Sequence, residues 1–141
     1  MVYDEEVPAG DIPAPHLLVV EDEVLIRVAV ADYFRECGFE VYLASNTNEA
    51  KAILEAGLIV HVVFTDVEMP GEMNGFALAR WVKEHHSDIE VIVTSDVARM
   101  ASDAADLCES AAFVAKPYDH ALLADRVKEL LARRDRTTRE L

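Results

Sequence analysis

The chain has 141 residues, a length that fits one ordinary domain with a single hydrophobic core. Apolar residues make up 52% of it, yet no uninterrupted apolar run approaches the roughly 18 residues that a membrane-spanning helix needs. The 27 acidic and 13 basic residues give a formal net charge of -14, which would repel the phosphate backbone of a nucleic acid. We therefore expect neither a membrane segment nor direct binding to DNA or RNA.

The first fifteen residues contain four acids, three prolines and no base. Because a secretory signal begins with basic residues followed by an apolar run, this composition favours a cytoplasmic protein. The prolines indicate a linker-like N-terminal lead at residues 1–15.

Five short apolar runs alternate with longer stretches of helical periodicity. The runs are continuously apolar, as is typical of strands buried on both faces, and they cover residues 17–20, 41–44, 62–64, 91–93 and 113–115. The stretches after them predict helices at residues 23–37, 47–56, 75–86, 97–109 and 119–134. Gly38 and Gly57 are suited to end the first two helices, and Asn46 with Glu49 is close to a capping box.

This alternation predicts the fold class. A strand and a helix that alternate five times indicate an α/β fold, in which helices cover both faces of a doubly wound parallel sheet of five strands. The domain would span residues 16–134 and leave a C-terminal tail at residues 135–141, where we expect the chain to fray.

Polar residues follow four of the five predicted strands, in the place where open parallel sheets gather ligands and chemistry. They are Glu21 and Asp22, Asp66, Thr94 with Ser95, and Lys116 with Pro117. Taken singly, each has a structural explanation: an acid caps a helix or a turn, a threonine suits a strand, and Lys-Pro makes a turn. Their occurrence at four strand ends together favours one shared site.

Three carboxylates at one edge repel each other and need positive charge nearby. Mg²⁺, or the similar Mn²⁺, suits oxygen ligands, and Asp66, one acid of the Glu21–Asp22 pair and the backbone carbonyl of Glu68 could supply them. Lys116 adds a fixed cation and Thr94 a hydroxyl donor. These are the groups needed to move a phosphoryl group onto Asp66, since that reaction depends on positioning and charge neutralisation.

Four segments, LLVVEDE, FTDVEMPGEMNG, VIVTS and FVAKPYD, occur in this order between about His16 and Arg133. In sequence and separation they resemble the receiver domain of two-component response regulators. The resemblance implies a flavodoxin-like three-layer α/β/α fold. It also implies that Asp66 accepts phosphate from a sensor histidine kinase or a histidine phosphotransfer protein.

The same resemblance implies individual roles. Glu21 and Asp22 become the acidic pocket for Mg²⁺, Thr94 the switch hydroxyl, and Lys116 the phosphate partner, followed by a cis bond to Pro117. Phe113 falls at the aromatic switch position. Glu68 and Asp96 fall at the rim where attacking water enters, so they would affect the lifetime of the phosphorylated state.

One departure from the family pattern lies after the phosphoacceptor. Four residues, Gly71-Glu72-Met73-Asn74, separate Pro70 from Gly75, one more than the family's commonest pattern. The phosphorylation chemistry would remain, but the shape of this loop is expected to differ.

The sequence ends soon after the fifth predicted helix, so we expect a stand-alone receiver that signals to a protein partner or by forming a homodimer. The surface formed by the fourth helix, fifth strand and fifth helix is the expected contact. Arg126, Arg133 and Arg134 offer cationic contacts there, although the same bases could simply solvate a helix end.

Two other readings of the sequence remain. Asp66-Val67-Glu68 also resembles the DxD motif of haloacid dehalogenase-like phosphatases, although that motif normally follows the first strand and its family usually carries a cap insertion. A receiver-like scaffold that never takes phosphate is disfavoured, because every expected site residue is present.

Other residues that could form a site give weaker signals. Cys37 and Cys108 have no metal-ligand spacing and are expected to be buried, reduced thiols. His85–His86 is expected to be a solvated pair, whereas His16, His61 and His120 have no spaced companions.

Overall fold

The computed structural model describes residues 14–69, 73–96 and 112–140. Its elements, in chain order, are β1 (His16–Val20), α2 (Val24–Glu36), β2 (Glu40–Ala44), α3 (Thr47–Glu55), β3 (Val62–Asp66), α4 (Gly75–His85), β4 (Glu90–Asp96), β5 (Ala112–Lys116) and α6 (His120–Glu140). All five predicted strands are present. The predicted helix at residues 97–109 and the N-terminal lead up to residue 13 lie outside the described residues.

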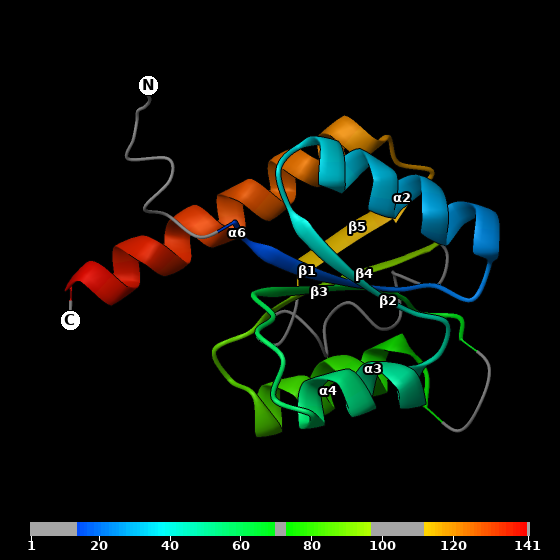
Figure 1. Cartoon of the computed structure of the whole chain (residues 1–141), viewed down its shortest axis with the longest axis horizontal. Coiled ribbons are helices and arrows are strands. Elements are labelled where there is room, and N and C mark those ends of the chain that lie inside the picture. Colours follow the sequence, from blue (N-terminus) through cyan, green and yellow to red (C-terminus); the bar gives the residue numbers. More distant parts are fainter. Residues whose placement is uncertain (1–13, 70–72, 97–111, 141) are drawn as a thin grey trace.

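The strands form one parallel sheet in the order β2-β1-β3-β4-β5. Helices α2 and α6 cover one face of this sheet, and α3 with α4 covers the other (Figure 1). The predicted doubly wound α/β fold is therefore confirmed. Helix α6 continues to Glu140, so the backbone beyond residue 134 is helical where the sequence predicts a frayed tail.

Alternate strand residues supply two separate cores. Leu17 and Val19 of β1 pack beneath α2 and α6, with Phe34 among their neighbours. Leu18 and Val20 face the opposite way, towards α3 and α4, with Leu78 among their neighbours. Leu18, Val20 and Phe34 are fully buried. This period of two fixes which side of the sheet each strand-end residue faces.

Side chains and glycines set the helix boundaries. Asn46 accepts a hydrogen bond from the N–H of Glu49 at 2.8 Å, and Glu49 accepts one from the N–H of Ser45 at 2.7 Å, which completes the expected capping interaction. The chain leaves α2 and α3 through Gly38 and Gly57, whose φ angles of 96° and 85° disfavour a side chain.

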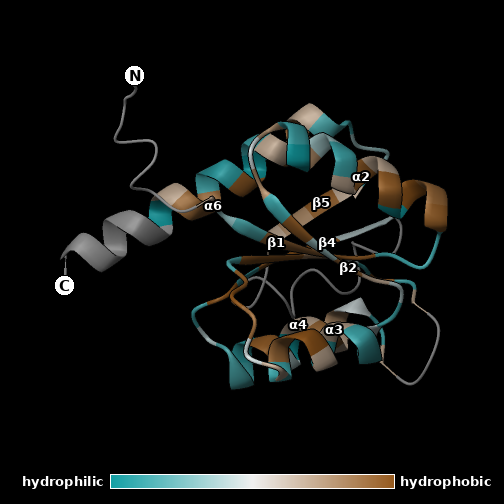
Figure 2. Cartoon of the chain, viewed as in Figure 1, coloured by the Kyte–Doolittle hydropathy of each residue, from teal (hydrophilic) through white to brown (hydrophobic). Residues whose placement is uncertain are grey.

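The first turns of α2 expose apolar side chains, which Figure 2 shows as the brown end of that helix. Val24, Leu25 and Val28 are 59%, 85% and 42% exposed. Among the described residues, no helix combines the length and the apolar character needed to cross a membrane.

One prediction about an isolated residue is wrong. Cys37 is exposed rather than buried, because it caps α2 at the point where the chain turns away from the core; Cys108 lies outside the described residues. His16 and His61 do meet, because the parallel pairing of β1 and β3 aligns their amino ends: the N–H of His16 donates to Nδ1 of His61 at 2.9 Å.

The His85–His86 pair has an aromatic neighbour. The ring centroids of the two histidines lie 4.9 and 5.5 Å from that of Trp81. This packing accounts for both side chains without a metal.

Candidate functional site

The register of the sheet places four predicted site residues on one face. Each follows by two residues a side chain of the core under α2 and α6: Glu21 follows Val19, Asp66 follows Phe64, Thr94 follows Ile92, and Lys116 follows Val114. Because strand side chains alternate, all four emerge towards α2 and α6 at the carboxyl edge of the sheet. The sequence predicted that these four residues lie at the same edge of the sheet. The register shows that they also lie on the same face.

Asp66 lies at the centre of this group and is 4% exposed. The Lys116 ammonium nitrogen lies 2.7 Å from its Oδ2, and the N–H of Glu68 donates to its Oδ1 at 3.1 Å. Each carboxylate oxygen therefore has one donor, and charge-assisted bonds of this kind orient a carboxylate strongly. Glu68 itself is exposed.

Glu21 is 2% exposed and borders Asp66. Burial and, to a smaller extent, the negative charge of Asp66 raise the pKa of Glu21 to about 7, although the N–H of Glu23, which donates to its Oε2 at 3.1 Å, acts in the opposite direction. The neighbouring Asp22 is exposed. The Lys116 ammonium group is thus the cation that neutralises Asp66, and a further positive charge would stabilise the ionised form of the neighbouring Glu21.

A hard divalent cation fits this set of oxygen donors. Within the described residues, no three His, Cys, Asp or Glu side chains converge closely enough to make a metal site by themselves. Mg²⁺ does not need such a cage, since it commonly binds one or two carboxylates and keeps several waters. Two adjacent buried carboxylates, of which one has a raised pKa, are the kind of site that such a cation stabilises.

Thr94 pairs in register with Asp66 across β3 and β4. Its side chain is fully buried, and its Oγ1 makes no hydrogen bond with any described residue. A buried hydroxyl without a partner costs free energy, so this donor is available to an anion bound at Asp66. Ser95 also has an unpaired Oγ, but its place in β4 directs it towards the opposite face.

Phe113 lies on the other face of the sheet, where it packs against the core under α3 and α4. Its ring centroid is 6.1 Å from that of Phe76, at an interplanar angle of 66°. Phe76 was not predicted from the sequence. Its position directly after Gly75 at the start of α4 is the signal that could have indicated it.

A cleft of about 440 Å³ opens beside the acidic pocket, lined by Glu21, Ile26, Lys116, Pro117, Tyr118 and His120. The Lys116–Pro117 bond is cis, as the family resemblance implies. Burial raises the pKa of Tyr118 to about 12, with the charges of Glu21 and Asp66 adding to the effect. Tyr118 and His120 were missed because a tyrosine and a histidine after a Lys-Pro turn carry no recognisable motif.

The remaining predicted residues are only partly described. Asp96 ends β4 opposite Lys116 in the register of β4 and β5, and its side chain lies outside the described part of the chain. Pro70, Gly71 and Glu72, in the loop that departs from the family pattern, are outside it as well. The loop resumes at Met73, whose carbonyl accepts a hydrogen bond from the Thr47 hydroxyl at 3.2 Å.

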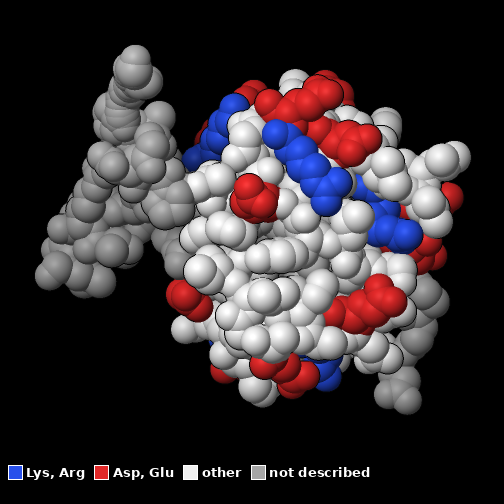
Figure 3. Space-filling view, viewed as in Figure 1, with Lys and Arg blue, Asp and Glu red and all other residues white. Residues whose placement is uncertain are grey.

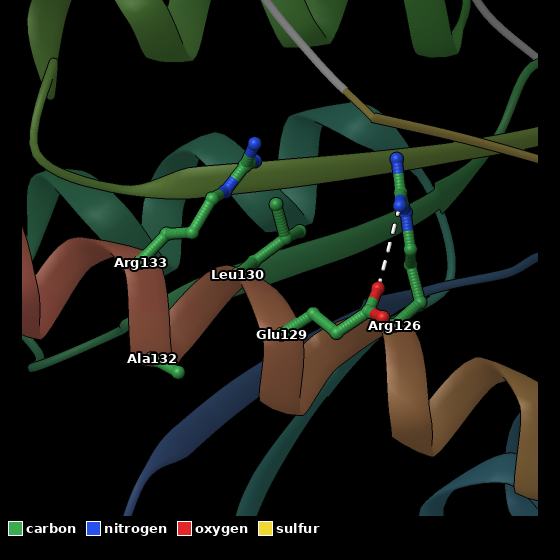
Figure 4. A pocket seen from close by; sticks show the side chains of 5 residues that line it. All are labelled: Arg126, Glu129, Leu130, Ala132 and Arg133. Carbon is green, nitrogen blue, oxygen red and sulfur yellow. Dashed lines mark hydrogen bonds and ion pairs between the residues drawn. The ribbon is translucent and has the colours of Figure 1, made fainter.

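The charged surface in view contains no continuous basic patch. Figure 3 shows Lys and Arg side chains interspersed with Asp and Glu side chains over the helices at the top of the molecule. On α6, a second cleft of about 300 Å³ is lined by Arg126, Glu129, Leu130, Ala132 and Arg133. Figure 4 shows Arg126 and Arg133 extending on either side of Leu130, with Arg126 3.4 Å from a Glu129 carboxylate oxygen.

Comparisons with known proteins agree with this geometry. A family model described as the response regulator receiver domain matches residues 17–128. The sensor kinase CckA of Brucella abortus is 37% identical over 122 residues, which are 84% of this chain and 13% of CckA. The chain spans about half the length of the other curated relatives that it matches.

Solved structures show the same fold. The signal receiver domain of a histidine kinase from Syntrophus aciditrophicus is 31% identical with a TM-score of 0.74, covering 84% of this chain and 91% of that one. The response regulator TrrA of Thermotoga maritima, solved in complex with Mg²⁺–BeF, is 28% identical with a TM-score of 0.72, covering 82% and 98%. These matches do not favour the haloacid dehalogenase-like alternative.

Proposed function

The chain belongs to the response regulator receiver domain family of two-component systems, and we propose that Asp66 is its phosphoacceptor. The donor would be a sensor histidine kinase or a histidine phosphotransfer protein. The observation that carries this proposal is the arrangement around Asp66: an ammonium group 2.7 Å away and, on the adjacent strand, a buried hydroxyl that bonds to no described residue.

In the proposed step, the N–P bond of a donor phosphohistidine breaks as a P–O bond forms to a carboxylate oxygen of Asp66. The bonding pair leaves with the histidine nitrogen. Lys116, 2.7 Å from Asp66, would offset the charge on the transferred group, and Thr94, which pairs with Asp66 across the two strands, would donate a hydrogen bond to it.

Mg²⁺, or Mn²⁺, supplies additional positive charge for phosphoryl oxygens when it is bound. Asp66, one carboxylate of the Glu21–Asp22 pair and the backbone carbonyl of Glu68 would hold it. The Mg²⁺–BeF complex of the related TrrA supports this assignment, as does the raised pKa of Glu21.

The donor protein would dock beside this site. Val24, Leu25 and Val28 expose a connected apolar area on the first turns of α2, and Leu122 at the start of α6 is 57% exposed. Ile26, from the same turn of α2, lines the cleft beside Lys116. This apolar area reaches the cleft beside Lys116 through Ile26 and would suit an apolar helix of the kinase or phosphotransfer protein.

Signal output would follow from the response of Thr94 and Phe113. When Thr94 turns towards the new phosphate, the end of β4 would shift. Phe113, which lies on the other face of the neighbouring strand β5, would then give up its present contact with Phe76. The surface of β5 and α6, together with the predicted helix at residues 97–109, would then contact a protein partner or a second copy of the chain. Arg126 and Arg133 supply cationic contacts on the described part of this surface.

Loss of the phosphoryl group would be slow autodephosphorylation rather than turnover of an outside substrate. Glu68 stands exposed two residues after Asp66, and Asp96 follows Thr94 by two. We expect both acids to orient or hinder the attacking water. Replacing both by Ala should therefore change the rate of dephosphorylation.

Intact-mass spectrometry with a small-molecule phosphodonor and Mg²⁺ tests the phosphoacceptor. One acid-labile phosphoryl group should appear on the wild type and be absent from Asp66→Asn. Lys116→Met should leave the protein folded but slow the reaction by about 10²-fold, because a preorganised charge is lost. The same adduct on Asp66→Asn, or turnover of phosphoester substrates by the wild type, would contradict the proposal.

A further inference from the structure

Arg27 occupies an unusual position for a cation. It is the fourth residue of α2, whose first turn contains no acid, and the positive end of the helix dipole disfavours a cation there. The side chain is half-buried, and its Nη1 donates a hydrogen bond of 2.7 Å to the backbone carbonyl of Glu21. Because helical side chains lean towards the N-terminus, Arg27 reaches back over the loop that carries the acidic pair.

Two other polar groups of Glu21 have partners as well. Its N–H donates to the carbonyl of Ala44 at 3.0 Å, and its Oε2 accepts from the N–H of Glu23 at 3.1 Å. Arg27 holds the carbonyl, so both backbone groups of Glu21 are fixed. Since this carbonyl shares a rigid peptide plane with the N–H of Asp22, Arg27 sets the direction in which the chain delivers the Asp22 side chain.

The charge of Arg27 also acts on an acid of the neighbouring helix α3. Ser45 donates to Oε1 of Glu49 from both its N–H, at 2.7 Å, and its hydroxyl, at 2.8 Å. These bonds lower the pKa of Glu49, and the charge of Arg27 contributes to the same effect. Arg27 therefore makes a hydrogen bond to the β1–α2 loop, and its charge also acts on an acid of α3.

We propose that Arg27 is a positioning residue for the cation pocket, which holds the Glu21–Asp22 peptide in the orientation that Mg²⁺ binding requires. The proposal rests on the Mg²⁺ site of the proposed function. Two effects of Arg27 on Mg²⁺ oppose each other, since its charge repels a cation while its hydrogen bond orders the ligands. Outer partners that orient metal ligands commonly change affinity by about 10–100-fold, which is larger than the screened repulsion expected for a charge at the rim.

The test measures Mg²⁺ binding by calorimetry on the unphosphorylated protein, together with thermal unfolding in a chelator. Arg27→Met should weaken Mg²⁺ binding by about tenfold. Arg27→Lys, which keeps a cationic donor, should recover most of the loss. Arg35→Met is the matched control, because Arg35 also lies on α2 and donates to a backbone carbonyl, that of Val41 at 3.1 Å, away from the acidic pocket.

The control variant should bind Mg²⁺ as the wild type does, although it removes the same charge. Equal or tighter binding by Arg27→Met would overturn the proposal, and so would an equal loss in Arg35→Met. If Arg27→Met does not fold, Arg27→Gln replaces it with the same expectation. Failure of the wild type to bind Mg²⁺ would instead overturn the proposed metal site, and with it the role of Arg27.

Discussion

Gly75 at the start of α4 lies directly against the backbone of Asp66. A Cβ atom on residue 75 would be 2.8 Å from the carbonyl carbon of Asp66 and from Cα of Val67, and closer still to the Asp66 carbonyl oxygen. The N–H of Gly75 also donates to the carbonyl of Val67 at 2.9 Å. Only glycine allows α4 to approach the proposed phosphoacceptor this closely, because the atoms in the way are backbone and cannot rotate aside.

Gly75→Ala is expected to push α4 away from the end of β3. The free energy of unfolding should fall by about 2 kcal/mol, as in other overpacked sites, and phosphorylation of Asp66 by a small-molecule donor should slow. Denaturant unfolding and intact-mass kinetics measure the two effects. Gly57→Ala is the control. The φ of 85° at Gly57 makes alanine costly there, but nothing lies within 4 Å of the added carbon, and Gly57 follows α3 rather than contacting Asp66. If both variants phosphorylate at the wild-type rate, the contact between Gly75 and Asp66 does not position the site.

The raised pKa of Glu21 predicts how stability depends on pH. The folded-state pKa, about 7, is above the usual 4.5, so the folded state binds the proton more tightly than the unfolded state does. The resulting stabilisation is complete below about pH 4.5 and is lost as pH rises through 7. In the presence of a chelator, the stability of Glu21→Gln should not fall over this pH range. At pH 8 its free energy of unfolding should exceed that of the wild type by on the order of 2 kcal/mol. Parallel stability curves for the two proteins between pH 5 and about 8 would contradict the raised pKa.

The apolar area on α2 predicts a variant that separates docking from chemistry. Leu25 is 85% exposed on the first turn of α2, next to Ile26 of the cleft, so Leu25→Ser should slow phosphotransfer from the kinase by about tenfold through the loss of buried apolar area. Phosphorylation by a small-molecule donor should not change. Ile59→Ser is the control, because Ile59 is 63% exposed but precedes β3 at the opposite edge of the sheet. Equal slowing in both variants would place the docking surface elsewhere.

The contact between Phe113 and Phe76 predicts how phosphorylation reaches β5. Hydrogen exchange of the β5 amides should change when the wild type is phosphorylated, because Phe113 leaves its place against Phe76. Thr94→Ala should accept the phosphoryl group and lose most of this change. In Phe76→Leu, the β5 amides should exchange faster than in the wild type even without phosphorylation, because the ring that packs against Phe113 is missing. An undiminished phosphorylation-dependent change in Thr94→Ala would mean that the hydroxyl does not carry the signal.

The sequence by itself determined the sheet and the residues at its edge. The apolar runs are short and continuous and alternate with helical stretches, of which the first two end at Gly38 and Gly57, so strand type and order follow from local signals. Asp66 and Lys116 stand 50 residues apart in the chain, yet their meeting at 2.7 Å was predictable because parallel strands deliver their ends to the same edge.

Only the tertiary structure decided the contacts that adjust this site. The hydrogen bond from Arg27 to the Glu21 carbonyl depends on how α2 lies over β1, and the approach of Gly75 to Asp66 depends on how α4 packs under β3. Phe76 and Phe113 meet because the pleat directs Phe113 away from Lys116, towards the face that α4 covers. Such contacts arise from the packing of whole elements. Periodicity in the sequence predicts which face of an element is buried, but it does not predict which residues of another element that face contacts.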